Sequence, residues 1–128
     1  MSMHFEHFGL NVEEPLKMAE WYVENCRMRI LRGMQEAPFT HFLADETGKV
    51  FLEIYCNRKA VVPDYAGRQP LEFHFAFAVP DAAAAKDRLV QAGATLAEEI
   101  HLEDGSLLFM LRDPWGVPLQ ICQRSRPF

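Results

Sequence analysis

The chain has 128 residues, 49% of them hydrophobic, which is enough to build the core of one compact domain. Its formal net charge of −5, with acidic and basic residues interspersed, gives no basic stripe that could follow a phosphate backbone, so we expect no nucleic-acid partner. No apolar run is long enough to cross a bilayer and the first residues lack the pattern of a secretory signal, so we expect a cytoplasmic protein with no membrane partner.

The first half of the chain predicts a strand, a helix and three more strands. Its opening stretch alternates apolar with small or polar residues, the period of a half-buried strand, and the apolar members are Phe8, Leu10 and Val12. Glu14-Pro15 then predicts a helix start, because a proline in the first turn has no N–H to leave unpaired. The apolar side of this helix is expected to hold Leu16, Ala19, Tyr22 and Val23. The further strands are expected at about residues 29–32, 39–44 and 50–55.

Residues 57–70 are polar and hold two prolines and a glycine, a composition typical of a linker. The same order of elements follows it. The alternating strand has its apolar positions at Phe73, Phe75, Phe77 and Val79. Asp81 is a natural N-cap for the helix that the next four alanines favour. The last strands are expected at about residues 95–101, 106–111 and 117–122, and Asp104-Gly105 predicts a two-residue hairpin turn between the first two of them.

The two halves are related by an internal repeat. A shift of 67 positions pairs Phe8 with Phe75, Leu10 with Phe77, Val12 with Val79, Val23 with Val90, Phe42 with Phe109, Leu52 with Leu119 and Ile54 with Ile121. We therefore predict one α+β domain over residues 1–128, built from two tandem βαβββ modules at about residues 3–56 and 71–123.

Four polar side chains are predicted on the strand face that points away from the core. Alternate residues of a strand point to opposite sides, and the apolar face is formed by Phe8, Leu10, Leu52, Ile54, Phe75, Phe77, Leu119 and Ile121. The other face carries His7, Glu53, His74 and Gln120, and the repeat maps His7 onto His74 and Glu53 onto Gln120. If the two sheets close face to face, these groups converge in a site suited to a divalent metal such as Zn, Ni, Fe, Mn or Co. A lone histidine is more often a surface or core residue, but repeat-related histidines favour the metal site.

Three further side chains are predicted to line a substrate pocket around that site. Phe51 and Tyr55 flank Glu53 on the same strand face, and Cys122 follows Gln120 at the same spacing. Tyr55 either orients a ligand oxygen through its hydroxyl or only closes the cavity. The three cysteines share no Cys-x-x-Cys spacing, so Cys122 is expected to be a free thiol. His41, in a middle strand, could also reach the cavity.

Two segments carry a resemblance to a known family: Phe5-Glu6-His7-Phe8-Gly9-Leu10-Asn11-Val12 and Asp113-Pro114-Trp115-Gly116-Val117-Pro118-Leu119-Gln120-Ile121. They resemble the opening strand and the closing segment of the vicinal-oxygen-chelate superfamily, which includes glyoxalases, bleomycin-resistance proteins and extradiol dioxygenases. The resemblance implies a glyoxalase-like fold with a cup-shaped mixed sheet, a homodimer and a metal-centred pocket. Gln120 departs from the family, which usually has a glutamate there. An amide oxygen can coordinate a metal but cannot take a proton, which argues against plain glyoxalase I chemistry.

The resemblance implies a divalent-metal-dependent enzyme that acts on a small molecule chelating the metal through vicinal oxygens. Lyase, isomerase and dioxygenase chemistry all fit this description. His7, Glu53 and His74 would be metal ligands, Gln120 a fourth and weaker one, and Glu53 the catalytic proton shuttle. Two alternatives stay open: a metal-free small-molecule-binding protein of the bleomycin-resistance type, and a degenerate family member without catalysis.

Overall fold

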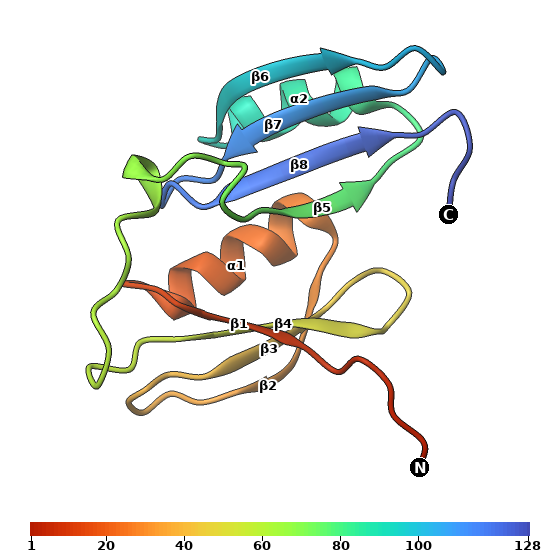
Figure 1. Ribbon diagram of the computed structural model, residues 1–128. Coiled ribbons are helices and arrows are strands. Elements are labelled where there is room, and N and C mark those ends of the chain that lie inside the picture. Colours follow the sequence, from red (N-terminus) through yellow and green to blue (C-terminus); the bar gives the residue numbers. More distant parts are fainter. The chain divides into compact units, whose positions relative to one another are not determined.

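A computed structural model describes every residue from 1 to 128. The chain divides into two units, Met1–Pro63 and Asp64–Phe128, and the boundary between them falls inside the segment predicted as a linker. Each unit holds one α-helix and a four-stranded mixed sheet (Figure 1), which confirms the α+β class and the two βαβββ modules. Neither helix has the length and apolar content that a membrane span requires.

In the first unit a helix lies across one face of the sheet (Figure 1). The elements are β1 (Phe8–Asn11), α1 (Pro15–Cys26), β2 (Arg29–Gly33), β3 (His41–Ala44) and β4 (Val50–Tyr55). The strand order is β1-β4-β3-β2, with β1 parallel to β4 and the other pairs antiparallel. The buried residues include Leu43, Leu52 and Ile54 of the sheet, and Met18 and Tyr22 of α1. β1 and β4 lie side by side as a parallel hydrogen-bonded pair.

The second unit repeats this arrangement. Its elements are a short 3-10 helix, η1 (Tyr65–Gly67), then β5 (Phe75–Ala78), α2 (Ala82–Gln91), β6 (Thr95–His101), β7 (Leu107–Arg112) and β8 (Pro118–Gln123). The strand order is β5-β8-β7-β6, again with the first pair parallel. Asp81 caps α2 as predicted, because its carboxylate accepts a hydrogen bond from the N–H of Ala84 at 3.0 Å. Buried Leu89 of α2 and buried Phe109, Leu119 and Ile121 of the sheet belong to its core.

The repeat also holds in the strand register, with one correction. Phe8 pairs with Leu52 in the first unit as Phe75 pairs with Leu119 in the second. Phe42, however, lies opposite Glu53, whereas Phe109 lies opposite Ile121. The pairing of Phe42 with Phe109 is therefore wrong, because the register of β4 with β3 steps from Leu52 to Val50 and makes Phe51 the extra residue of a β-bulge, which the second unit lacks.

Three local predictions are also corrected. Phe8 was expected in the core but is 44% exposed, because it begins an edge strand with a neighbour on one side only. Val23 is exposed, and the buried side of α1 is formed by Pro15, Met18, Ala19, Trp21 and Tyr22. The turn at Asp104-Gly105 is longer than two residues, since a backbone hydrogen bond from Leu102 to Ser106 closes it around the three residues between them.

The segment that resembles the family's closing motif forms the tight turn before β8. Oδ1 of the buried Asp113 accepts hydrogen bonds from the N–H groups of Trp115 and Val117, both at 2.9 Å. Arg112 donates to the carbonyls of Tyr65 and Gly116 at 2.9 and 3.1 Å, which attaches η1 to the same turn. The turn thus fixes where β8 starts, and with it the position of Gln120.

Candidate functional site

In the first unit, the structure brings together two of the predicted ligands. His7 directly precedes β1. Glu53 lies in β4 and pairs with Gly9, which follows His7 by two residues. Both side chains lie on the sheet face away from α1, and Nε2 of His7 is 3.5 Å from Oε1 of Glu53. Their side chains are 31% and 22% exposed, so both are accessible to a small ligand or ion.

Both predicted histidine ligands use Nδ1 in a hydrogen bond. Nδ1 of His7 is 2.8 Å from Oε1 of Glu6, and Nδ1 of His74 is 3.0 Å from the carbonyl oxygen of Pro70. A carbonyl oxygen only accepts, and so does an ionised carboxylate, so Nδ1 carries the proton in each ring. In the neutral ring Nε2 then holds a free lone pair, the arrangement that metal-binding histidines commonly show. The anchoring acceptors were not identified from the sequence, although Glu6 beside His7 was a visible signal.

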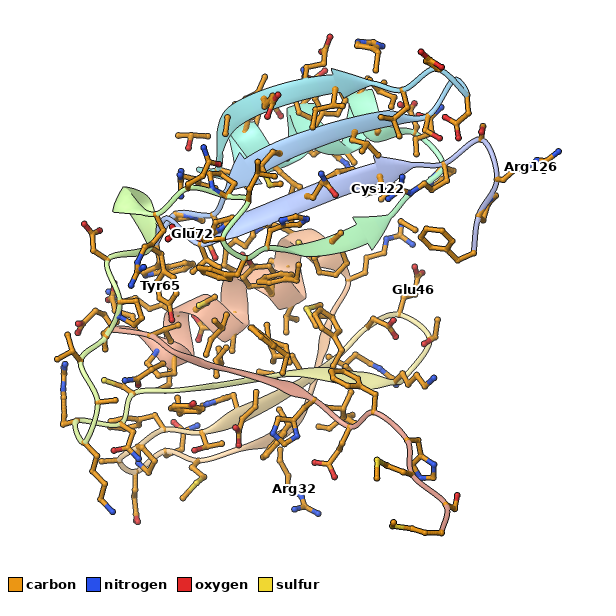
Figure 2. The ribbon with its side chains drawn as sticks, viewed as in Figure 1. Arg32, Glu46, Tyr65, Glu72, Cys122 and Arg126 are labelled. Atoms are coloured by element: carbon orange, nitrogen blue, oxygen red, sulfur yellow. The ribbon has the colours of Figure 1, made fainter.

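The predicted groups of β8 in the second unit contact each other. Gln120 is 8% exposed, and its Oε1 accepts a hydrogen bond from Sγ of Cys122 at 3.3 Å. Figure 2 labels Cys122 on β8. Burial raises the pKa of its thiol, and the positive charge of Arg124 has a smaller, opposing effect. The thiol therefore stays protonated and acts as a donor that orients the amide. One lone pair of the amide oxygen is left for another partner.

Aromatic side chains surround the His7 and Glu53 pair. The ring of Phe42, which lies opposite Glu53 in β3, meets the ring of His7 edge to face with centroids 5.5 Å apart. Phe51 and Tyr55 are half-buried on either side of Glu53 in β4. Phe42 was not identified from the sequence because the repeat placed it on the core side. The pair therefore lies on an aromatic surface suited to an organic ligand.

His41 does not lie on this face. It pairs with Ile54, is 3% exposed, and donates through Nδ1 to the carbonyl of Phe39 at 2.7 Å. The β-bulge places it where the second unit has Phe109. The suggestion that His41 reaches the cavity is therefore wrong, and this histidine belongs to the core.

The first unit brings two side chains of metal-ligand type close together. Two ligands that each lie about 2.1 Å from a tetrahedral ion are about 3.4 Å apart. The 3.5 Å between the His7 imidazole and the Glu53 carboxylate agrees with that spacing. Neither unit holds by itself three or more His, Cys, Asp or Glu side chains grouped for a metal ion. The first unit thus supplies two ligands of the right type and spacing, fewer than a protein metal site normally needs.

Comparison with known proteins identifies the family. Residues 7–122 match the glyoxalase-like domain family, so the chain belongs to that family and to the vicinal-oxygen-chelate superfamily. The match spans both units and begins at His7. No match was found among curated proteins.

Solved structures share the fold over nearly the whole chain. TnmS3, an antibiotic-binding protein from Streptomyces sp. CB03234, is 18% identical with a TM-score of 0.73, covering 97% of this chain and 98% of its own. A glyoxalase-related enzyme from Fulvimarina pelagi is 19% identical with a TM-score of 0.70, covering 96% and 89%. A member of the glyoxalase/bleomycin resistance protein/dioxygenase superfamily from Sphaerobacter thermophilus DSM 20745 is 14% identical with a TM-score of 0.68, covering 96% and 98%. Identities this low establish the fold alone, and the fold serves both binding proteins and enzymes.

Proposed function

We propose that the chain is a divalent-metal-dependent enzyme acting on a small molecule that offers two adjacent oxygens. His7, Glu53 and His74 are its metal ligands and Gln120 is the fourth, so each unit contributes one histidine and one oxygen donor. The observation that carries the proposal is the 3.5 Å contact between Nε2 of His7 and Oε1 of Glu53, with Nδ1 of His7 held by Glu6. The proposal also includes a homodimer, which the resemblance to the family implies, and the cytoplasmic location expected from the sequence.

The residues of the site have separate tasks in this proposal. A bound divalent ion would act as a Lewis acid on the substrate oxygens, which would make a C–H on the carbon next to a coordinated carbonyl easier to deprotonate. Glu53 is the carboxylate that can accept and return the proton, since the Gln120 amide cannot. Phe42, Phe51 and Tyr55 pack against the substrate and keep water away from Glu53. Proton transfer of this kind serves lyase or isomerase chemistry, while ring cleavage by a dioxygenase would use the ligand set of two histidines and Glu53.

Elemental analysis tests the proposal directly. The wild type, purified without chelator or affinity metal, should hold close to one equivalent of a divalent metal. His7→Ala and His74→Ala should each lose the metal. Loss of a hydrogen-bond partner behind a ligand already lowers metal affinity about 10- to 100-fold, and loss of the ligand itself should lower it further. His101→Ala is the matched control, since His101 is exposed and paired with Glu99 at 2.8 Å. A wild type without metal even after reconstitution would refute the metal centre.

A second candidate is a metal-free small-molecule-binding protein. The observation in its favour is the half-buried carboxylate of Glu53 on an aromatic surface formed by Phe42, Phe51 and Tyr55, which suits a cationic aromatic ligand. In this case His7→Ala and Glu53→Gln would weaken ligand binding while metal salts would leave the melting temperature unchanged. A rise in melting temperature on adding a divalent metal, lost in His7→Ala, would decide for the metal centre and against the metal-free binding protein.

A further inference from the structure

A row of side chains crosses the sheet of the first unit on the face that holds His7. The strand pairing places Arg32 of β2 opposite Phe42 of β3, and Phe42 opposite Glu53 of β4. Residues directly opposite each other in neighbouring strands point to the same side of a sheet. The edge-to-face contact of Phe42 with His7 identifies that side as the face of the proposed site. Arg32 lies at the outer end of the row, and Figure 2 shows its side chain pointing away from α1.

A β-bulge in the edge strand β2 brings Arg32 to this face. Ile30 lies opposite the buried Leu43, so its side chain points to the core side of the sheet. In a regular strand Arg32, two residues later, would point to the core side as well. The register of β2 with β3 steps from Ile30 to Arg32, which leaves Leu31 as the extra residue and turns Arg32 to the opposite face. Bulges often redirect a side chain in this way beside an active site.

The fold does not require a positive charge at this position. Arg32 is exposed and takes part in no ion pair, unlike Arg27, Arg58 and Arg68.

The second unit has a corresponding row, in which Glu98 of β6 lies opposite Met110 and Met110 lies opposite Gln120. A carboxylate thus occupies the outer position that Arg32 holds in the first unit. Since this edge of the sheet accepts either sign of charge, the guanidinium of Arg32 needs an explanation outside the fold.

We propose that Arg32 binds a carboxylate of the ligand. The ligand lies along the row, with its metal-binding oxygens at His7 and Glu53 and its apolar middle on the ring of Phe42. Neighbouring strands are about 4.8 Å apart, so the Cα atoms of Arg32 and Glu53 are separated by about 10 Å. A guanidinium matches a carboxylate with two parallel N–H···O hydrogen bonds. This assignment rests on the proposed function and narrows its substrate class to carboxylic acids whose acid group is several bonds away from the chelating oxygens.

Two probes that differ in charge test the role of Arg32. Dihydrocaffeate, a catechol with a propanoate chain, carries chelating oxygens, an apolar middle and a carboxylate, and its methyl ester lacks the negative charge. Isothermal titration calorimetry gives the dissociation constant of each probe for metal-loaded and chelator-treated protein, with metal content measured for each variant.

The variants are Arg32→Met, which removes the charge, and Arg32→Glu, which reverses it at a position where the second unit has a glutamate. Arg29→Met is the matched control. Arg29 is exposed on the same strand, but its guanidinium lies over the turn between β3 and β4, where its Nη2 is 2.9 Å from a Cβ built on Gly48.

The wild type should bind the acid about tenfold more tightly than the ester, the effect of a charge-assisted hydrogen bond. Arg32→Met should bring the two dissociation constants together by weakening only the acid, Arg32→Glu should favour the ester, and Arg29→Met should keep the ratio of the wild type. A ratio that persists in Arg32→Met would overturn the assignment and leave Arg32 a solvated surface residue. Equal binding of the two probes to the wild type, or binding of neither, would overturn it too. A wild type without metal would refute the proposed function instead, and the ratio in chelator-treated protein would still decide on Arg32.

Discussion

Gly116 closes the turn before β8 and has two separate reasons to be a glycine. Its φ is +87°, a region where a side chain costs roughly 1–2 kcal/mol. A Cβ on it would lie 2.8 Å from both the backbone N and the Cβ of Ala66 in η1, so a methyl group also overpacks this contact by about 1–3 kcal/mol. Gly116→Ala is therefore expected to lower the free energy of unfolding by about 2–5 kcal/mol. Urea unfolding followed by circular dichroism measures this difference.

Gly105 provides the matched control for the contact with Ala66. Its φ is +90°, but a Cβ there would have no other heavy atom within 4 Å. Gly105→Ala keeps the backbone strain without the clash and should cost roughly 1–2 kcal/mol. Gly116→Ala should then be the more destabilising of the two by about 1–3 kcal/mol. Equal losses in the two variants would refute the argument that η1 is packed against this turn.

Two further predictions concern buried polar side chains. Burial raises the pKa of the Cys122 thiol above its ordinary value of 9.0, so the folded state holds this proton more tightly than the unfolded chain. The free energy of unfolding should consequently fall as pH rises above about 9, and Cys122→Ala should remove part of that slope; an identical slope in the variant would contradict the assignment. His41→Ala should lower the free energy of unfolding by about 2–4 kcal/mol, through the cavity and the lost hydrogen bond to Phe39, measured by urea unfolding. It should leave metal content unchanged, and metal loss would show that His41 is not only a core residue.

The elements could be predicted from the sequence because their signals are local. Alternation in β1 and β5, Pro15 at the start of α1 and the Asp81 cap of α2 depend on neighbouring residues only, and the structure confirms them. The β-bulge at Phe51 has no such signal, since an extra residue leaves the apolar pattern of β4 intact. That single residue moved Phe42 to the ligand face and His41 into the core. The wrong predictions for Phe42 and His41 therefore both come from the one-residue shift at this bulge.

The contact of His7 with Glu53 could be predicted, because the parallel strands β1 and β4 convert sequence spacing into contact. The residue two positions after each histidine pairs with the oxygen donor of the same unit, Gly9 with Glu53 and Ala76 with Gln120. Side chains two residues apart on a strand share a face, so His7 is expected diagonally next to Glu53, and Nε2 of His7 is 3.5 Å from Oε1 of Glu53. The corresponding contact of His74 with Gln120 stays a prediction. The hydrogen-bond partners Glu6, Pro70 and Cys122 were beyond this argument, since loop carbonyls and side-chain rotamers follow no period.

The same pairing explains why the two modules can differ in chemistry while keeping one fold. Gly9 and Tyr55 in the first unit correspond to Ala76 and Cys122 in the second. Gly9 and Ala76 are exposed and Tyr55 is half-buried, whereas Cys122 is buried. The repeat can therefore carry a partly exposed carboxylate in the first unit, and a buried amide oriented by a buried thiol in the second. A Gln120→Glu variant should raise metal affinity, since a carboxylate binds divalent ions better than an amide does. Without metal it should be less stable than the wild type, because Gln120 is 8% exposed and a buried carboxylate loses its hydration. Unchanged affinity in metal titrations of Gln120→Glu, in a wild type that binds metal, would show that β8 does not supply a ligand and that Gln120 serves the substrate instead.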